Sequence, residues 1–122
     1  MPGYTDDTGM LIKLLDRHDA RARLIHRRAL EGGASVPTVC WAEYFRGQWV
    51  DPQFVASVSF ESLSRPIAEL AGRALRKVKD VQLADAVVVA GAALRGDLVV
   101  TSDLPDISRL AAHFPSVRVL RV

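Results

Sequence analysis

Four acidic side chains occupy positions from which a chain of alternating strands and helices would bring them together: Asp7, Glu43, Asp85 and Asp103. Asp7 and Asp103 follow strand-like runs, in Y-T-D-D-T-G and L-V-V-T-S-D, whereas the other two lie in helix-like segments. Burying acids that are far apart in sequence is costly unless a cation compensates their charge. The pattern therefore predicts a divalent-metal site, with metal-assisted hydrolysis of phosphodiester bonds as its use.

The predicted chemistry needs oxygen ligands and water, and it needs no serine or histidine nucleophile. Mg²⁺ or Mn²⁺ suits carboxylate ligands, can activate a water molecule for in-line attack and can neutralise charge on the scissile phosphate. We expect Asp7 and Asp103 to contact the metal directly. Glu43 and Asp85 would complete the coordination shell or orient the water.

Most of these acids also have an ordinary structural explanation. Asp7 and Asp85 could cap the helices that follow them, and Asp103 could be a turn residue. Asp106 comes three residues after Asp103, so it is either a further acid on the same helix face or a first-turn acid favoured by the helix dipole. The occurrence of all these acids in one ordered set favours the metal site.

Glu43 could be a solvated helix residue. Its neighbours Cys40, Trp41 and Phe45 instead predict a largely buried helix, in which a lone ionised glutamate would be expensive. We expect Trp41, Trp49, Tyr44 and Phe60 to lie in the core or in an interface rather than to stack on bases.

Hydrophobic periodicity and turn residues predict alternating strands and helices along the whole chain. Strands are expected at about residues 3–6, 34–37, 54–63, 98–101 and 117–120, with 54–63 near an edge. Helices are expected at about residues 8–16, 18–30, 38–45, 66–79, 83–94 and 104–114, with Thr38 able to cap the third.

This alternation predicts an α/β fold, a three-layer sandwich with a central parallel sheet of about five strands and helices on both faces. The length suits one domain over residues 1–122. Sites in such sheets form outside the carboxyl ends of the strands, where the strand order reverses. Asp7 and Asp103 each follow a strand, so we expect them at that crevice.

The chain resembles the PIN-domain family, and most closely its VapC-type toxin branch. The resemblance rests on four segments in the order and at spacings similar to those of the family: D-T-G-M-L-I-K-L-L (7–15), V-P-T-V-C-W-A-E-Y-F-R-G (36–47), D-A-V-V-V-A (85–90) and V-V-T-S-D-L-P-D-I (99–107). Each segment alone is a weak signal, whereas the ordered set is fairly specific.

The resemblance implies a PIN-like fold and a metal-dependent ribonuclease in which the four acids bind Mg²⁺ or Mn²⁺. It also implies that Thr101 and Ser102 supply hydroxyls that orient a carboxylate or a phosphate, and that Asp106 is a less constant extra acid. Proteins of the toxin branch are neutralised by a cognate antitoxin, often form dimers and cut structured RNA. The same partners are therefore expected here: an RNA substrate, an antitoxin protein and a second copy of the chain.

Asp6 departs from the family pattern, in which an apolar residue precedes the first acid. Either Asp6 or Asp7 could therefore face the metal. Asp7 is favoured because it directly precedes T-G-M-L-I, which matches the start of the family's first helix.

Composition and charge fit a polyanion-binding enzyme without demanding one. The net charge is only +2, from 16 Lys and Arg against 14 Asp and Glu, but acids drawn into a metal site would leave a more basic outer surface. Basic residues of 18–30, with Arg73, Arg76, Lys77 and Lys79, could follow RNA phosphates, although a solvated helix face explains most of them. No glycine-rich nucleotide-binding loop is present in the sequence.

The single cysteine, Cys40, excludes a disulfide within the chain and predicts a small core residue in a reducing compartment. The first residues lack the pattern of a signal peptide, and the longest apolar run, 84–94, is too short to span a bilayer. These features predict a cytoplasmic protein with no membrane partner.

Three other functions compete with a toxin ribonuclease. The first is a PIN nuclease that matures RNA without an antitoxin, and the second is a catalytically silent PIN-like module for binding or dimerisation. The presence of all four acids argues against a silent module. The third is a phosphoacceptor signalling domain, which Asp6 and Asp7 could mimic, but the chain ends R-V-L-R-V without the lysine that such a domain needs.

Overall fold

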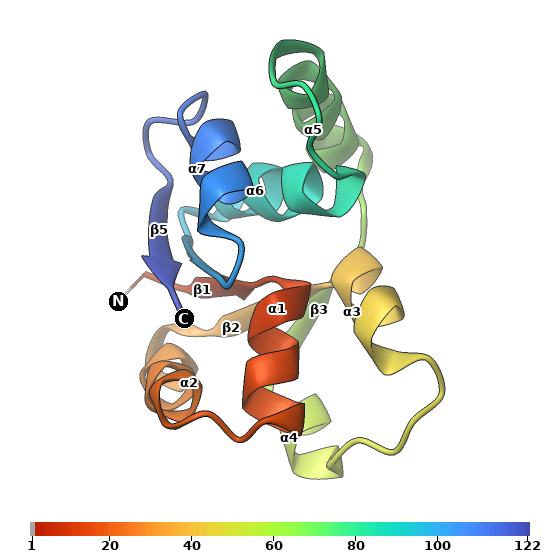
Figure 1. Cartoon of the computed structure of the whole chain (residues 1–122), viewed down its shortest axis with the longest axis vertical. Coiled ribbons are helices and arrows are strands. Elements are labelled where there is room, and N and C mark those ends of the chain that lie inside the picture. The colour runs from red at the N-terminus through yellow and green to blue at the C-terminus, as the bar shows by residue number, and fades with distance from the viewer. Residues whose placement is uncertain (1) are drawn as a thin grey trace.

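The computed structural model describes residues 2–122, and it has a five-stranded sheet in the order β3-β2-β1-β4-β5 (Figure 1). Every neighbouring pair of strands is parallel, as predicted. The strands are β1 (Tyr4–Asp6), β2 (Ala34–Pro37), β3 (Ser59–Glu61), β4 (Leu98–Thr101) and β5 (Arg118–Arg121).

Helices connect the strands and cover both faces of the sheet. They are α1 (Thr8–Leu11), the π-helical continuation η1 (Ile12–Asp16), α2 (Ala20–Gly32), α3 (Thr38–Phe45), α4 (Pro52–Ser57), α5 (Arg65–Lys77), α6 (Leu83–Arg95) and α7 (Leu104–Ala111). Figure 1 shows α5, α6 and α7 on one side of the sheet, and α1, α2 and α4 on the other. This arrangement is the predicted three-layer sandwich.

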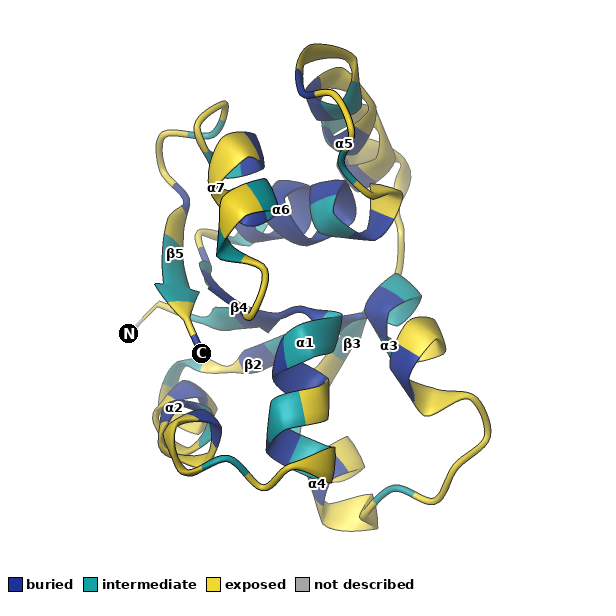
Figure 2. Cartoon of the chain, viewed as in Figure 1, coloured by how far each residue is buried: buried dark blue, intermediate teal, exposed yellow. Residues whose placement is uncertain are grey.

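Each face of the sheet has its own hydrophobic core. One core joins α6 to α5, α7 and Val99, and the other joins α1, α2, Val36 and Val100. Helix α6 is buried along most of its length (Figure 2), because eight of its residues are apolar or glycine and inaccessible to solvent or nearly so. Burial on most sides is the reason that its sequence is almost continuously apolar.

The central position of β1 decides where a site can form. The chain runs from β1 to β2 and β3 on one side of β1, and the later strands β4 and β5 add on the other side. The strand order therefore reverses between β1 and β4, and the crevice expected at such a switch point lies beyond their carboxyl ends. Asp7 directly follows β1, and Asp103 comes two residues after the end of β4.

The prediction for residues 54–63 is half wrong. Residues Pro52–Ser57 form α4, and only Ser59–Glu61 form a strand, although that strand lies at an edge of the sheet as predicted. The Asp51 side chain accepts a hydrogen bond from the Gln53 backbone N–H at 2.9 Å and so caps α4. Pro52 occupies the first turn, where its fixed φ favours a helix.

Two smaller predictions also need correction. Pro37 takes the N-cap position of α3, and no side chain caps this helix, so Thr38 is its first residue rather than its cap. The Trp49 side chain is 81% exposed and lies outside the core, so only an interface is left of the two predicted places for it. Cys40 is buried as predicted.

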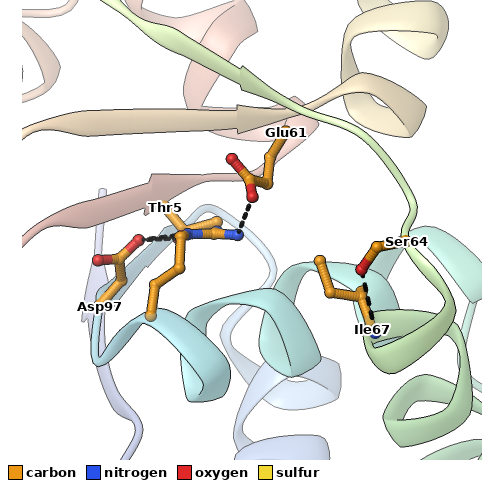
Figure 3. Close-up of polar contacts among 6 residues, drawn as sticks. Thr5, Glu61, Ser64, Ile67 and Asp97 are labelled. Carbon is orange, nitrogen blue, oxygen red and sulfur yellow. Dashed lines mark hydrogen bonds and ion pairs between the residues drawn. The ribbon is translucent and has the colours of Figure 1, made fainter.

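A polar cluster lies beneath the sheet, on the face that α6 covers. Arg95 Nε contacts Asp97 Oδ2 at 3.0 Å, its Nη2 donates to Thr5 Oγ1 at 2.8 Å, and its Nη1 lies 3.5 Å from Glu61 Oε1. Figure 3 shows Thr5 between the two carboxylates. Gly91 makes room for this arginine, because a Cβ at that position would lie 3.0 Å from Arg95 Nη1.

Gly91 is thus closely packed, and the guanidinium of Arg95 is the neighbour against it. Within residues 2–122, none of the helices combines the length and the hydropathy that a membrane crossing requires.

Candidate metal centre

Asp7 lies where β1 ends and α1 begins, and its carboxylate is held by two donors. Its Oδ1 accepts the Met10 backbone N–H at 2.8 Å, which makes Asp7 the N-cap of α1, and its Oδ2 accepts the Thr101 hydroxyl at 2.5 Å. Burial raises the pKa of Asp7, and these two hydrogen bonds oppose that rise. The predicted capping role is therefore compatible with a place in the site, because the same carboxylate does both.

Three further acids converge from two helices. Asp85 lies in the first turn of α6, Asp103 directly precedes α7, and Asp106 lies in the first turn of α7. One carboxylate oxygen from each of them lies within 4.8 Å of the other two. Asp103 makes no side-chain cap of α7, so its carboxylate is not engaged in that structural role. Asp106 is thus part of the cluster, and it also contacts Arg109 at 3.4 Å.

Glu43 reaches the site from α3, but the prediction that α3 is largely buried around it is wrong. The residue is exposed, as are Ala42 and Phe45, whereas only Cys40 and Tyr44 of α3 are buried. Its position is fixed instead by a hydrogen bond, since the Thr8 hydroxyl donates to Glu43 Oε1 at 2.7 Å. This bond ties α3 to the start of α1, directly beside Asp7.

One cavity brings together the four acids that the sequence singled out. It has a volume of about 510 Å³, and Asp7, Glu43, Asp85 and Asp103 all line it. Burial raises the pKa of Asp85 to about 7, and the charges of Asp103, Asp7, Asp106 and Glu43 add to that rise. The carboxyl of Asp85 is therefore close enough to these four acids for their charges to disfavour its ionised form.

The hydroxyls of the T-S-D segment are also placed at the site. Thr101 Oγ1 accepts the Asp103 backbone N–H at 2.8 Å while it donates to Asp7, so it links the ends of β1 and β4. Ser102 lines the cavity, and its side chain lies directly against Gly9, where a Cβ would overlap the Ser102 hydroxyl. Gly9 is therefore needed for the approach of Ser102.

Asp6 is directed away from the cavity. It is aligned with Val100 on the neighbouring strand, and residues in register on parallel strands face the same side of the sheet. Val100 belongs to the core beneath α1 and α2. Asp6 is 1% exposed, its Oδ2 has no hydrogen-bond partner within residues 2–122, and burial together with the charge of Asp7 raises its pKa to about 7.

Sequence reasoning missed several other residues of the cavity. Asp16, Tyr44, Arg46, Gln48 and Gln82 also line it. The Tyr44 hydroxyl donates to Asp16 Oδ1 at 2.6 Å, which joins the end of η1 to α3. The segment E-Y-F-R-G-Q contains three of these residues directly after Glu43, and this proximity is the signal that could have identified them.

The donor set fits a hard divalent cation. The acids offer only carboxylate oxygens, and these are the ligands that Mg²⁺ and Mn²⁺ prefer. Within residues 2–122, no lysine, arginine or histidine forms an ion pair with Asp7, Glu43, Asp85 or Asp103, because the observed pairs involve other acids. The charge of these four carboxylates is therefore left for a bound ion to compensate.

No family model and no curated protein matches the sequence. Solved structures do match, and they include chains from VapBC structures, a family of toxin–antitoxin systems. VapBC2 of Rickettsia felis, solved with a promoter DNA fragment, matches at 13% identity and a TM-score of 0.76, over 98% of both chains. DNA-bound VapBC of Salmonella typhimurium matches at 18% identity and a TM-score of 0.77, over 99% of this chain and 98% of the other.

VapBC-5 of Mycobacterium tuberculosis matches at 20% identity with a TM-score of 0.63, over 99% of this chain and 100% of the other. At these identities the matches show the fold. The PIN-like fold predicted from four short motifs, and the likeness to VapC-type toxins, are thereby confirmed.

Proposed function

We propose that this protein is a metal-dependent endoribonuclease that hydrolyses RNA phosphodiester bonds with Mg²⁺ or Mn²⁺, and that it is the toxin of a type II toxin–antitoxin pair. The observation that carries the proposal is the single cavity at the switch point of the sheet, which four acids from distant parts of the chain line together. The fold shared with toxin components of toxin–antitoxin complexes supports the same conclusion.

Asp7, Glu43, Asp85 and Asp103 would hold the ion, with Asp106 as an accessory acid. When bound, a divalent cation supplies charge compensation for the scissile phosphate and lowers the pKa of a coordinated water. The chain's own contribution is to fix the ligands. Thr101 and the Met10 N–H orient Asp7, and Thr8 orients Glu43. Such outer partners keep a carboxylate in the productive geometry before any ligand arrives.

Protonation of Asp85 would make metal binding at this site depend on pH. Its pKa, raised to about 7, means that its carboxyl is partly protonated at neutral pH when no cation is near. A bound cation would favour the ionised form, so binding of the ion and loss of this proton are coupled. Metal affinity is therefore expected to rise with pH through the neutral range.

The partners belong to the same proposal. The neighbouring structures named above are complexes of a toxin with its antitoxin, and by analogy an antitoxin protein would bind this chain. Dimerisation, a cytoplasmic location and the single domain over residues 1–122 stay predictions from the sequence.

Cleavage of RNA by the purified protein tests the enzymatic part. We expect cleavage with Mg²⁺ or Mn²⁺, none with a chelator, and none for Asp103→Asn when circular dichroism shows that the variant is folded. Glu31→Gln, an exposed acid on α2, is the control and should cut like the wild type. Cleavage that persists in chelator, or a folded Asp103→Asn as active as the wild type, would reject the mechanism.

Growth experiments separate a toxin from an RNA-maturation nuclease or a silent binding module. Expression of the wild type should arrest growth, and expression of Asp103→Asn should not. Relief of the arrest by a small protein encoded next to this chain would support the antitoxin pair. An active nuclease that leaves growth unaffected would instead favour the maturation enzyme.

A further inference from the structure

Arg46 is the one cationic side chain, among residues 2–122, that lines the acidic cavity. Five carboxylates line the same cavity, those of Asp7, Asp16, Glu43, Asp85 and Asp103. A cavity with this balance repels a phosphodiester, and each bound divalent ion removes only part of the negative charge. A substrate phosphate therefore needs a further cation at its own position, and Arg46 is the residue in place to provide one.

The backbone at Arg46 has a conformation that residues with a Cβ seldom adopt. Its φ of 47° and ψ of 26° are left-handed, and Gly47 follows with a φ of 84°. Left-handed backbone is unfavourable for a residue with a Cβ, and outliers of this kind cluster at ligand-binding sites. Glycine would be the ordinary choice at a position that ends a helix in this way.

One hydrogen bond holds the Nε end of the Arg46 guanidinium and leaves its two Nη groups available. Arg46 Nε donates to the Glu43 carbonyl oxygen at 3.0 Å, and this oxygen belongs to the last turn of α3. Within the described part of the chain, neither Nη atom has a hydrogen bond or an ion pair with a carboxylate. The two Nη groups are therefore held beside Glu43 with their donors unused.

We propose that Arg46 binds a backbone phosphate of the RNA strand inside this cavity, through its free Nη donors. The inference rests on the proposed nuclease function and assigns a substrate-binding residue to the same site. A guanidinium matches phosphate geometry because two parallel N–H donors reach two non-bridging oxygens. Arg46 is then a phosphate-positioning residue that offsets part of the repulsion between the cavity acids and the substrate phosphate.

A purely structural role is the rival explanation, because Arg46 Nε also satisfies a carbonyl at the end of α3. Arg46→Gly separates the two roles. Glycine relieves the left-handed backbone and removes the cation, so the phosphate-binding role predicts an unchanged or raised melting temperature together with weaker RNA binding. The structural role predicts a lowered melting temperature and unchanged RNA binding.

The experiment compares the wild type, Arg46→Gly, Arg46→Lys and a control, Arg118→Gln, whose arginine is exposed on β5 and which should bind and cut RNA like the wild type. Binding of a short labelled single-stranded RNA is measured with Ca²⁺ over a series of salt concentrations, and kcat/KM is measured with Mg²⁺. For Arg46→Gly we expect both affinity and kcat/KM to fall about 10- to 100-fold, as for a lost hydrogen bond to a charged group. The salt slope of log K should shrink by about 0.7, as for one lost phosphate contact on a single strand.

Arg46→Lys should recover part of the loss, because it restores the charge without the planar fork. Equal RNA binding and an equal salt slope for the wild type and Arg46→Gly would overturn the inference, as would a failure of the wild type to bind RNA. A wild type that binds RNA through Arg46 but never cleaves it would overturn the proposed nuclease function instead.

Discussion

Two clusters of acids lie close to β1, and they compensate their charge in opposite ways. Beneath the sheet, Asp97 and Glu61 contact Arg95, which the chain itself supplies. Beyond the carboxyl ends of β1 and β4, the acids Asp7, Glu43, Asp85 and Asp103 share a cavity without an ion pair among the described residues.

The difference shows which cluster is structural and which is open to a ligand. In the Arg95 cluster the acids meet a cation of the chain itself, and the Thr5 hydroxyl hydrogen-bonds both Asp97 and Arg95. The acid cavity instead contains a carboxyl whose pKa rises to about 7, that of Asp85, because burial and the charges of the neighbouring acids disfavour its ionised form. Strongly perturbed pKa values cluster at functional sites.

The largest expected effect comes from Asp85→Asn. RNA cleavage should fall by about a thousandfold, since the charge stabilisation that a bound metal supplies is worth several kcal/mol. The metal-free variant should nevertheless be more stable than the wild type at pH 8, because it lacks a carboxyl that its neighbours and burial disfavour when ionised. Cleavage assays and thermal unfolding measure the two quantities. A variant that is both inactive and less stable would place Asp85 with the structural acids.

The pH dependence of stability tests the buried carboxyl beside the cavity, Asp6. Burial and the charge of Asp7 raise its pKa to about 7 from the ordinary value of 3.8, so the folded state binds more protons than the unfolded state between those two values. The free energy of unfolding of the metal-free protein therefore falls as pH rises across this window. Asp6→Val removes this contribution, and its advantage over the wild type should grow by about 4 kcal/mol between pH 4 and pH 8.

Urea unfolding of metal-free protein at several pH values measures this difference, and a gap that does not change with pH would contradict it. RNA cleavage by Asp6→Val should stay close to that of the wild type, because Asp6 does not line the cavity. A large loss of cleavage would show that Asp6, and not only Asp7, serves the metal.

Metal binding should stabilise the folded protein. At a free Mg²⁺ or Mn²⁺ concentration about a hundred times Kd, linkage gives about 3 kcal/mol. Thermal unfolding with and without the ion measures this gain, with Na⁺ at matched ionic strength as the control. Asp103→Asn should lose most of the gain, and Asp97→Asn should keep it. An equal gain in both variants would mean that the ion binds elsewhere.

The smallest expected effect is on the cluster beneath the sheet. Asp97→Asn should lower the free energy of unfolding by about 2 kcal/mol, less than for a fully buried pair because the Arg95 side chain is 20% exposed. Glu61→Gln is the matched comparison and should cost less, since Glu61 is more exposed and its contact is longer. Urea unfolding measures both. If Asp97→Asn instead stabilised the protein, the ion pair with Arg95 would not be structural, and the two clusters of acids would not differ in this respect.

The sequence predicted the sheet and four of the five acids that line the cavity, from an ordered set of motifs that are weak one by one. Strand-exit acids such as Asp7 and Asp103 could be placed because parallel strands end at a common edge. Residues 54–57 were predicted as strand because their apolar residues partly alternate. They are helical because Asp51 caps α4 and Pro52 favours its first turn.

Contacts between distant segments could not be predicted. Glu43 meets Thr8, and Asp97 meets both Arg95 and Thr5, through hydrogen bonds between segments that are mostly far apart in sequence. The left-handed backbone of Arg46 follows from the way in which α3 ends, and no residue pattern announces such a conformation at an arginine. Sequence periodicity reports which face of an element is buried, but it carries little information about which polar partner a side chain meets.

The contact between Gly9 and Ser102 links two positions that are far apart in sequence. A side chain at position 9 would occupy the space of the Ser102 hydroxyl, so the two residues cannot vary independently. Among homologous chains, any residue larger than glycine at position 9 should be accompanied by a smaller or repositioned residue at position 102. Substitutions at positions 9 and 102 are therefore expected to occur in pairs during evolution.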